Sequence, residues 1–253
     1  MIKFFNPDSI MSAKESTRNA PSGFRYGFIP NIFREDVYLE LMANFPAVEK
    51  FKLVDKQSGG GRKRFFVGPT YDIEKTGACV CCLENLAEIW KDVLAESASP
   101  ELVSLLRESI GIKFNSLSMF GFAFGNEGCM QEAHVDGVVR DNPAVIWSPI
   151  ACLMYFNKSN VGPGGTCVYA ADRKTVLFQA PGLRNGLLFF EQHPDAWHGY
   201  PMMPAGAQRR IVSLAYSTDD PTVLPATSSM HRLTCKHRLK HRLKSFTHLI
   251  MGK

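Results

Sequence analysis

Two histidines and an aspartate have the types and the spacing to hold a divalent metal ion. One residue separates His134 from Asp136, and residues i and i+2 of a β-strand point to the same face. His198 lies much later in the chain, after the apolar run GLLFF and a turn. Two imidazoles and one carboxylate fill one face of an octahedron and leave the other face open, as a catalytic metal requires. The first pair alone is weak, because a polar surface strand has the same pattern.

Two arginines downstream of His198 offer a partner for an anionic ligand of that metal. A 2-oxo acid chelates iron through its oxo group and its C1 carboxylate, so its far carboxylate needs a planar, bidentate partner such as arginine. In the predicted strand RRIVSLAYS, Arg209, Ile211 and Ser213 share one face. We therefore expect Arg209 to point inward with the Ser213 hydroxyl beside the same carboxylate, and Arg210 is the alternative. Without the histidines, a solvated strand start would explain the pair equally well.

The elements that position these residues are predicted to be short β-strands. After Gly111 the sequence contains seven or eight apolar runs, separated by Gly, Pro and Asn. This pattern is typical of a β-sandwich or barrel, and it predicts a β core over residues 111–220. Residues 1–110 are predicted to form a mainly helical N-terminal layer that leans on this core. The length of 253 residues fits a single domain, 1–253, that ends in a basic tail at 221–253.

Three helices are expected in the N-terminal layer. Val37, Leu41 and Phe45 recur at four-residue spacing in one helix that Pro46 ends. Residues 81–110 predict two helices, broken at Ser99 and Pro100. Residues 1–23 carry few periodic signals, and we expect them to be loosely held.

A glycine-rich basic segment, QSGGGRKRFF, is predicted to be a mobile loop that runs into a strand. Arg62 and Arg64 lie in it. They belong either to a solvated basic loop or to a lid that captures a substrate carboxylate or phosphate. Gln131, Trp147 and the loop at 140–142 are further candidates for the entrance to the site.

The charge distribution argues against a nucleic-acid partner. Seven Lys and Arg lie in 232–253, and removing them from the total of +5 leaves −2 for the rest of the chain. The stretch 231–250 has an apolar helical stripe among basic residues, so it would dock on an acidic partner or a membrane surface, pack on the β core, or extend into solvent. The oligomeric state stays open.

The expected cellular location of the protein and the redox state of its cysteines depend on signals that we do not find in the sequence. We find no long apolar stretch for a transmembrane segment and no secretory signal, so we expect a cytoplasmic protein with seven reduced cysteines. The cluster ACVCC at 78–82 lacks a second cysteine pair or a nearby histidine. We interpret it as buried thiols rather than a metal site.

Residues 115–217 resemble the double-stranded β-helix core of the 2-oxoglutarate/Fe(II)-dependent dioxygenases, nearest to their prolyl-hydroxylase-like branch. The matching motifs are HVD at 134–136, MYFN at 154–157, GPGG at 162–165, APGLRNGLLFF at 180–190, and RRIVSLAY after His198. The resemblance implies an α+β fold with a jelly-roll core and N-terminal helices packed on one sheet. It also implies one oxygenase domain that uses Fe(II), 2-oxoglutarate and O₂.

The resemblance assigns roles by position. His134, Asp136 and His198 would bind the iron, and Arg209 would pair with the C5 carboxylate of 2-oxoglutarate. Tyr155 would reach the same carboxylate, or else be a strand tyrosine that faces the core. The sequence departs from the branch in two ways: the gap from His198 to the arginines is longer than usual, and Gln131 stands where relatives often have tyrosine.

The expected reaction is hydroxylation of an unactivated C–H in a small, amino-acid-like substrate, with decarboxylation of 2-oxoglutarate to succinate. Asp136 argues against a halogenase, because its carboxylate fills the position that chloride would need. A peptidyl or protein hydroxylase is the alternative, and the same chemistry also permits a desaturase or cyclase. The non-enzymatic alternative is a cupin-like binding domain.

Overall fold

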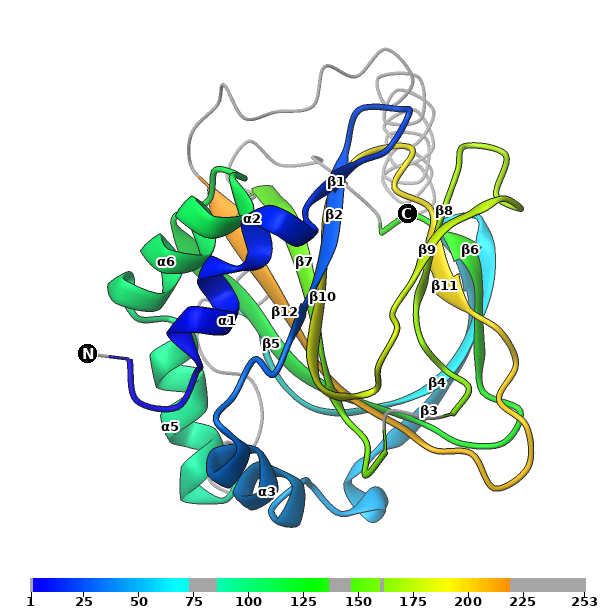
Figure 1. Ribbon diagram of the computed structural model, residues 1–253. Coiled ribbons are helices and arrows are strands. Elements are labelled where there is room, and N and C mark those ends of the chain that lie inside the picture. The colour runs from blue at the N-terminus through cyan, green and yellow to red at the C-terminus, as the bar shows by residue number, and fades with distance from the viewer. Residues whose placement is uncertain (1, 73–85, 137–146, 160–161, 219–253) are drawn as a thin grey trace, which may run out of the picture.

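The strands form one continuous antiparallel sheet that folds over into two facing layers. The computed structural model describes residues 2–72, 86–136, 147–159 and 162–218. Its strands are β1 (Arg18–Asn19), β2 (Arg25–Pro30), β3 (Lys52–Ser58), β4 (Gly61–Asp72), β5 (Ser116–Gly125), β6 (Met130–His134), β7 (Trp147–Phe156), β8 (Cys167–Tyr169), β9 (Val176–Gln179), β10 (Arg184–Glu191), β11 (His198–Tyr200) and β12 (Arg209–Thr218). They are hydrogen-bonded in the order β1-β2-β10-β7-β12-β5-β4-β6-β11-β8-β9, and β3 pairs with β4. Figure 1 shows the two layers facing each other.

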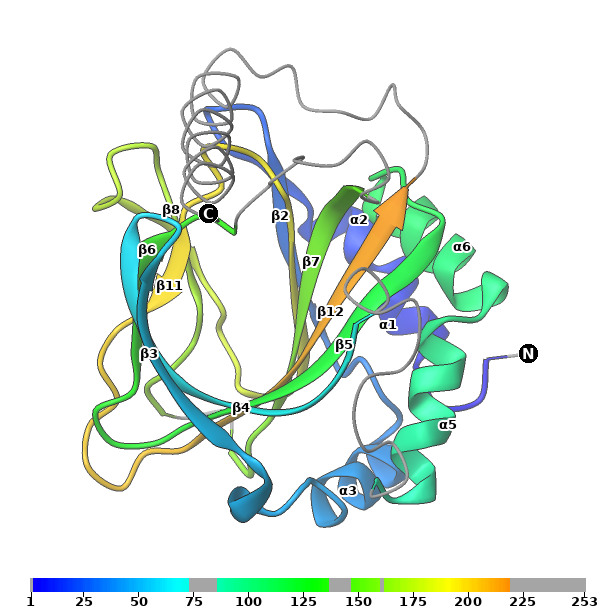
Figure 2. The ribbon, with the colours of Figure 1, turned by 180° about the vertical axis from the view of Figure 1, so that it is seen from behind.

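Strand β4 carries the sheet from one layer to the other. Its C-terminal part pairs with β5, from Phe66 to Asp72, whereas its N-terminal part pairs with β6 at Lys63 and Arg64. The major layer therefore contains β1, β2, β10, β7, β12 and β5, and the minor layer contains β6, β11, β8 and β9. In Figure 2, β4 curves beneath the space between the two layers and joins them. The β3–β4 hairpin consequently forms one wall of that space.

The helices cover the outer face of the major layer (Figure 1). They are α1 (Pro7–Met11), α2 (Ala13–Ser16), α3 (Glu35–Ala43), α5 (Glu88–Ser97) and α6 (Pro100–Ile110), with a short 3-10 turn, η1 (Val48–Lys50). The predicted architecture, a jelly-roll core with helices packed on one sheet, is confirmed. No helix in the described part of the chain is long and apolar enough to span a membrane.

Alternation along each strand produces two separate apolar clusters. In β7, Cys152 and Met154 belong to the cluster between the major layer and the helices. Ala151 and Tyr155 belong to the cluster between the two layers. Since successive side chains of a strand point to opposite faces, a strand that is buried on both sides must be apolar throughout. The long apolar runs of the sequence have this origin.

The helices follow their local sequence signals. Helix α3 begins at Glu35, and Val37 and Leu41 are buried as predicted. The predicted break between α5 and α6 is also present. Ser99 caps α6 by accepting a hydrogen bond from the Leu102 backbone N–H at 3.3 Å, and Pro100 occupies the first turn.

The prediction of a loosely held N-terminus was wrong. Phe4, Phe5 and Ile10 are buried in the cluster beneath the helices, and the Asn6 N–H donates to the Ile32 carbonyl at 2.8 Å. These apolar residues pack against the other helices and the major layer without any regular spacing, so a search for periodicity does not detect them.

The prediction that residues 1–110 are mainly helical was wrong in part. Strand β2 pairs with β10, and β4 joins the two layers. The expected mobile loop is instead the β3–β4 hairpin, whose turn contains Gly59 at φ +63° and Gly60 at φ +94°. Glycine adopts this left-handed backbone at little cost, and two consecutive positive φ angles are typical of tight hairpins.

Several predicted features lie outside the described residues. They are the cysteine cluster at 78–82, the loop at 140–142 and the basic tail at 221–253. The described cysteines, Cys129, Cys152 and Cys167, are buried and free.

Replacing Trp90 by alanine should destabilise the fold strongly. The Trp90 side chain is fully buried, its ring lies edge-on to Phe122 and Phe156 with centroids 4.8 and 5.0 Å away, and its Nε1 donates to the Asn44 carbonyl at 2.9 Å. We expect Trp90→Ala to lower the free energy of unfolding by about 3–5 kcal/mol in urea titrations. Leu39→Ala, at an exposed position of α3, should change it by less than about 0.5 kcal/mol. Equal losses of unfolding free energy in the two variants would contradict the packing described for Trp90.

Candidate metal centre

Three side chains converge at the junction of β6 and β11. His134 ends β6, His198 begins β11, and the two residues are direct partners in the ladder between these strands. Asp136 lies two residues beyond His134. The His134 Nε2 is 3.6 Å from Asp136 Oδ1, and the His198 Nε2 is 3.4 Å from Asp136 Oδ2. One ligand atom from each residue lies within 4.8 Å of the others, which is the spacing of atoms that share one metal ion.

Both imidazoles direct their Nε2 atoms toward the carboxylate of Asp136. The Nδ1 atoms of His134 and His198 lie 2.8 and 3.0 Å from the carbonyl oxygens of Glu132 and Ala196. Because a carbonyl only accepts, each Nδ1 carries a proton and each Nε2 is left to face the centre. Burial lowers the pKa of His134 to about 4, and the nearby His198 lowers it as well, against the opposing effect of Asp136. The ring is therefore neutral at pH 7.

Asp136 is ionised in the same arrangement. Burial by itself would raise the pKa of this carboxyl, but His198, His134 and Lys63 hold it well below its ordinary value. Two imidazoles and a carboxylate are a donor set that binds a divalent metal ion.

The hairpin turn of β3–β4 supports the segment between the ligands. The Val135 N–H donates to the Gly59 carbonyl at 3.0 Å. A Cβ added to Gly59 would lie 2.1 Å from the Val135 carbonyl oxygen, and one added to Gly60 would lie 3.0 Å from the Trp197 ring. The turn thus fits tightly between Val135, which joins two of the ligands, and Trp197, which precedes the third.

Arg209 brings a buried positive charge to the same cavity. Its Nε donates to the Gly164 carbonyl at 2.7 Å, and its Nη2 donates to the Thr166 hydroxyl at 2.8 Å. The Tyr200 ring lies 4.3 Å from the guanidinium carbon. Among the residues that the structure describes, no carboxylate forms an ion pair with this guanidinium. A buried cation without an acidic partner is the usual mark of an anion site.

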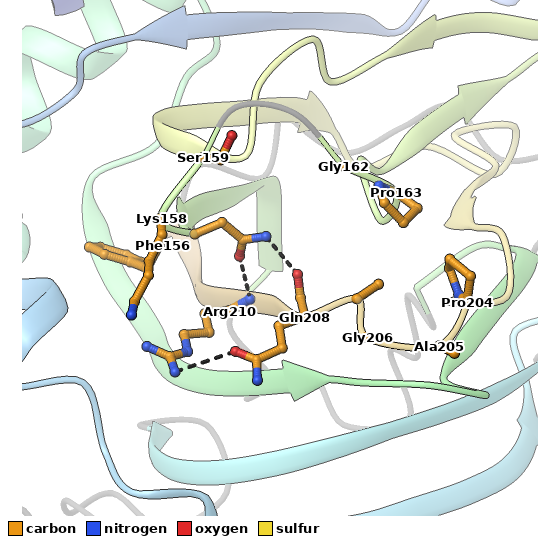
Figure 3. Close-up of a pocket in the computed structure, with 12 residues that line it drawn as sticks. Phe156, Lys158, Ser159, Gly162, Pro163, Pro204, Ala205, Gly206, Gln208 and Arg210 are labelled. Carbon is orange, nitrogen blue, oxygen red and sulfur yellow. Dashed lines mark hydrogen bonds between the residues drawn. The ribbon is translucent and has the colours of Figure 1, made fainter.

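Arg210 points the other way, as strand alternation requires. It contributes to a separate cavity of about 450 Å³ on the far side of β12 (Figure 3). There its N–H donates to Asn157 Oδ1 at 2.9 Å, and its guanidinium approaches Gln208 and lies 5.6 Å from the Phe45 ring centre. Of the two arginines, Arg209 is the one that faces the triad.

Tyr155 lies beside Arg209 but is already engaged. The side chain is fully buried among the apolar residues between the layers. Its hydroxyl accepts a hydrogen bond from the Thr166 N–H at 3.2 Å, and its ring centre is 5.7 Å from the Arg209 guanidinium carbon. Tyr155 thereby holds the segment that binds Arg209, and its direct contact with a ligand stays a prediction.

A cavity of about 580 Å³ between the layers contains most of the predicted site residues. Those that line it are His134, Asp136, His198, Arg209, Ser213 and Gln131. Trp147 is the first residue of β7, and its side chain lies outside the described part of the structure. The cavity is of the size that protein sites use for small ligands.

Of the two alternatives for Arg62 and Arg64, their positions agree with the solvated basic segment rather than with a lid over the site. Both point to the outer face of the hairpin, where Asp55 binds them at 2.9 and 3.3 Å. Lys63, which lies between them, points inward. Its Nζ is 3.3 Å from Asp136 Oδ1. Burial lowers the pKa of Lys63, and Asp136 opposes this shift.

Sequence reasoning missed Lys63, Thr166 and Tyr200. Strand alternation through RKR would have identified Lys63, but the preceding glycines had suggested a loop. Tyr200 lies two residues after His198 on β11, so the same period places it near the site. We see no sequence signal for Thr166 apart from its place after GPGG.

No protein-family model and no curated protein sequence matches the chain, whereas solved structures do. A prolyl-4-hydroxylase from Pseudomonas putida has a TM-score of 0.55 at 13% identity, over 84% of this chain and 98% of that one. A prolyl hydroxylase from Trichoplax adhaerens, solved in complex with a hypoxia-inducible-factor peptide fragment, has a TM-score of 0.54 at 16% identity, over 87% and 93%. A 2OG-Fe(II) oxygenase family protein from Burkholderia pseudomallei has a TM-score of 0.55 at 12% identity, over 83% and 89%. These likenesses show that the chain has the fold of that group, as its sequence resemblance predicted.

Replacing Gly59 by alanine should weaken metal binding, because the new Cβ would displace Val135 and with it Asp136. We expect Gly59→Ala to lower the affinity for Co(II), followed by its visible absorption, by about tenfold or more. Gly128→Ala is the matched control: its φ of +75° imposes a similar backbone cost, but its Cβ would meet nothing within 4 Å. Equal affinities in the two variants would show that the turn does not position Asp136.

Proposed function

We propose that this protein is an Fe(II)- and 2-oxoglutarate-dependent oxygenase that hydroxylates an unactivated C–H of a small polar substrate. One observation carries the proposal. The His134–Asp136–His198 cluster and the buried, acid-free guanidinium of Arg209 line the same cavity. The cluster is suited to bind a divalent metal ion. The guanidinium is suited to bind the far carboxylate of a dicarboxylate that coordinates that metal.

The three ligands fit iron by their chemistry. Two imidazoles and one carboxylate leave half of the coordination positions of an octahedral ion for other ligands. The backbone carbonyls behind each Nδ1 hold the rings in one orientation, so little rearrangement is needed when the metal binds. Asp136 occupies the third protein position, and that favours oxygen insertion over halogenation.

The Arg209 pocket fits the C5 carboxylate of 2-oxoglutarate. One N–H of Nε and one N–H of Nη2 donate to Gly164 and Thr166, and the remaining N–H groups on Nη1 and Nη2 are left for a bidentate pair. Ser213 lies on the same face of β12 and lines the cavity, so its hydroxyl is suited to donate to the same carboxylate. Tyr155 supports this end of the pocket through Thr166.

Bound iron and 2-oxoglutarate would supply the oxidising chemistry, with O₂ as oxidant and succinate and CO₂ as coproducts. The protein supplies geometry and a dry environment. Arg209 fixes one end of the cosubstrate while the triad fixes the other end, so the reacting face points into the cavity. Apolar walls contributed by Phe190, Leu153 and Ile211 exclude water from that face.

A peptide substrate is the second candidate, and the comparisons favour it: two of the three structures described above are prolyl hydroxylases, one of them in complex with a peptide fragment. Small amino-acid-like molecules and proline-containing peptides should therefore be screened together. The mass of the product, rather than succinate release alone, identifies the true substrate, because uncoupled turnover also releases succinate.

Anaerobic addition of 2-oxoglutarate to the Fe(II) protein should produce a visible metal-to-ligand charge-transfer band. Because the band requires chelation at the triad, His134→Ala should abolish it. A band that persists in this variant, or that never forms in the wild-type protein, would contradict the proposal.

Replacing Arg209 by glutamine should weaken 2-oxoglutarate binding by about a hundredfold, because a bidentate, charge-assisted pair is lost from a buried site. Arg210→Gln removes the same charge from the opposite face of β12 and should change the affinity by less than about twofold. Titration of the charge-transfer band gives both values. Equal losses in the two variants would show that Arg209 is not the carboxylate partner.

A further inference from the structure

We infer that the β3–β4 wall of the cavity binds an acidic group of the substrate through Lys63 and Lys56. This inference rests on the proposed function and names the class of substrate: a carboxylate- or phosphate-bearing molecule without a free amine near that group. The charged side chains of the hairpin are divided between its inner and outer faces.

The two lysines form a like-charged pair on the inner face. Lys56 and Lys63 are direct partners in the β3–β4 ladder, so their side chains leave the same face of the hairpin side by side. Both line the cavity, Lys63 buried and Lys56 exposed at the mouth. Like charges placed directly opposite each other in a sheet destabilise it unless an anion lies between them.

The outer face of the same hairpin provides the contrast. There Asp55 binds both Arg62 and Arg64, so each outward guanidinium has an ion-pair partner within the hairpin itself. On the inner face, Asp136 is the only carboxylate among the described residues that line the cavity, and it is a proposed metal ligand. The outward arginines thus share a carboxylate of the hairpin, whereas the inward lysines have no carboxylate of their own once Asp136 is engaged by a metal.

Lys63 has unused hydrogen-bonding capacity in this position. Its ammonium carries three donors, and among the described residues it contacts one acceptor, Asp136 Oδ1 at 3.3 Å. A buried ammonium with donors to spare is costly unless a ligand accepts from them. The lysine is therefore placed to bridge Asp136 and an anionic group in the cavity.

The charge balance shows that 2-oxoglutarate alone does not meet this demand. With both cofactors bound, the two charges of the metal and the one of Arg209 are cancelled by Asp136 and the dianion of 2-oxoglutarate. The two lysines then remain as surplus positive charge in a partly enclosed cavity. A substrate with up to two negative charges restores neutrality, whereas a free ammonium would add to the excess.

The position of Lys63 also limits where the substrate reacts. Because the Lys63 ammonium touches the carboxylate of a proposed metal ligand, an acidic group bound there lies close to the metal. The carbon that is hydroxylated should therefore lie only a few bonds from the acidic group. Gln131, the ladder partner of Lys63 on β6, also lines the cavity and offers an amide to the same part of the substrate.

Direct binding measurements on the anaerobic protein loaded with Fe(II) and 2-oxoglutarate test the inference. The probes are N-acetylaspartate, a dianion, and the nearly isosteric neutral N-acetylasparagine amide, and their binding is followed calorimetrically. We expect the dianion to bind the wild-type protein at least about tenfold more tightly than the amide. Lys63→Gln and Lys56→Gln should each reduce the affinity for the dianion by about tenfold and leave that for the amide unchanged.

Arg64→Gln is the matched control, because it removes the same charge from the outer face of the same strand. It should leave the affinity for the dianion unchanged, and Lys63→Arg should retain most of the wild-type affinity. Thermal unfolding of each variant checks that the hairpin is intact. The inference is wrong if Arg64→Gln lowers the affinity for the dianion as much as Lys63→Gln does. It is also wrong if the two probes bind to the wild-type protein with equal affinity.

The charge-transfer band, recorded before any probe is added, separates failure of the inference from failure of the proposed function. Lys63→Gln could lower the affinity for 2-oxoglutarate by the same factor as the affinity for the dianion. In that case Lys63 binds the C1 carboxylate of the cosubstrate, and the inference is overturned. If the wild-type protein forms no band, the proposed function fails and the inference falls with it. A normal band without preference for the dianion overturns the inference alone.

Discussion

The basic residues Arg209 and Lys63 of the cavity are positioned by the two-residue period of their β-strands. On β12 this period turns Arg209 toward the triad and Arg210 toward the helices. On β4 it turns Lys63 inward between two arginines that face solvent. Because a shift of one residue would exchange the two faces, the register of these strands decides the chemistry. The aromatic and aliphatic packing of both clusters fixes that register, since the same shift would expose the apolar core.

The apolar cluster beneath the helices thus stabilises the strands that carry the site. Buried charges such as Arg209 and Lys63 cost stability in the absence of a ligand. The fold offsets this cost locally with hydrogen bonds from Arg209 to Gly164 and Thr166, and with the contact of Lys63 to Asp136. These contacts leave N–H donors of both Arg209 and Lys63 without an acceptor among the described residues. Ligand binding should therefore stabilise the protein measurably.

Much of the core was predictable because its signals are local and redundant. Each of the runs after Gly111 is apolar, is bounded by turn residues and became a strand, and RRIVSLAYS oriented Arg209 correctly. The β3–β4 hairpin was missed for a physical reason. Its strands are largely polar, as an exposed edge hairpin must be, and three consecutive glycines outweighed the alternation in RKR. The N-terminal residues were missed because their burial depends on partners distant in the sequence, such as the contact of Asn6 with Ile32.

The same hairpin connects the proposed substrate wall to the metal ligands. At its turn, the Gly59 carbonyl binds the backbone between His134 and Asp136; along its strand, Lys63 binds Asp136 itself. An acidic group that binds the Lys63 ammonium would weaken its contact with Asp136. A metal ion that binds Asp136 would weaken the same contact from the other side. Because any such coupling between two binding events is reciprocal, an acidic substrate and the metal should influence each other's affinity through this one lysine. A hairpin that looks like a mobile surface loop in the sequence is therefore, by its position, the element that links the proposed substrate wall to the candidate metal site.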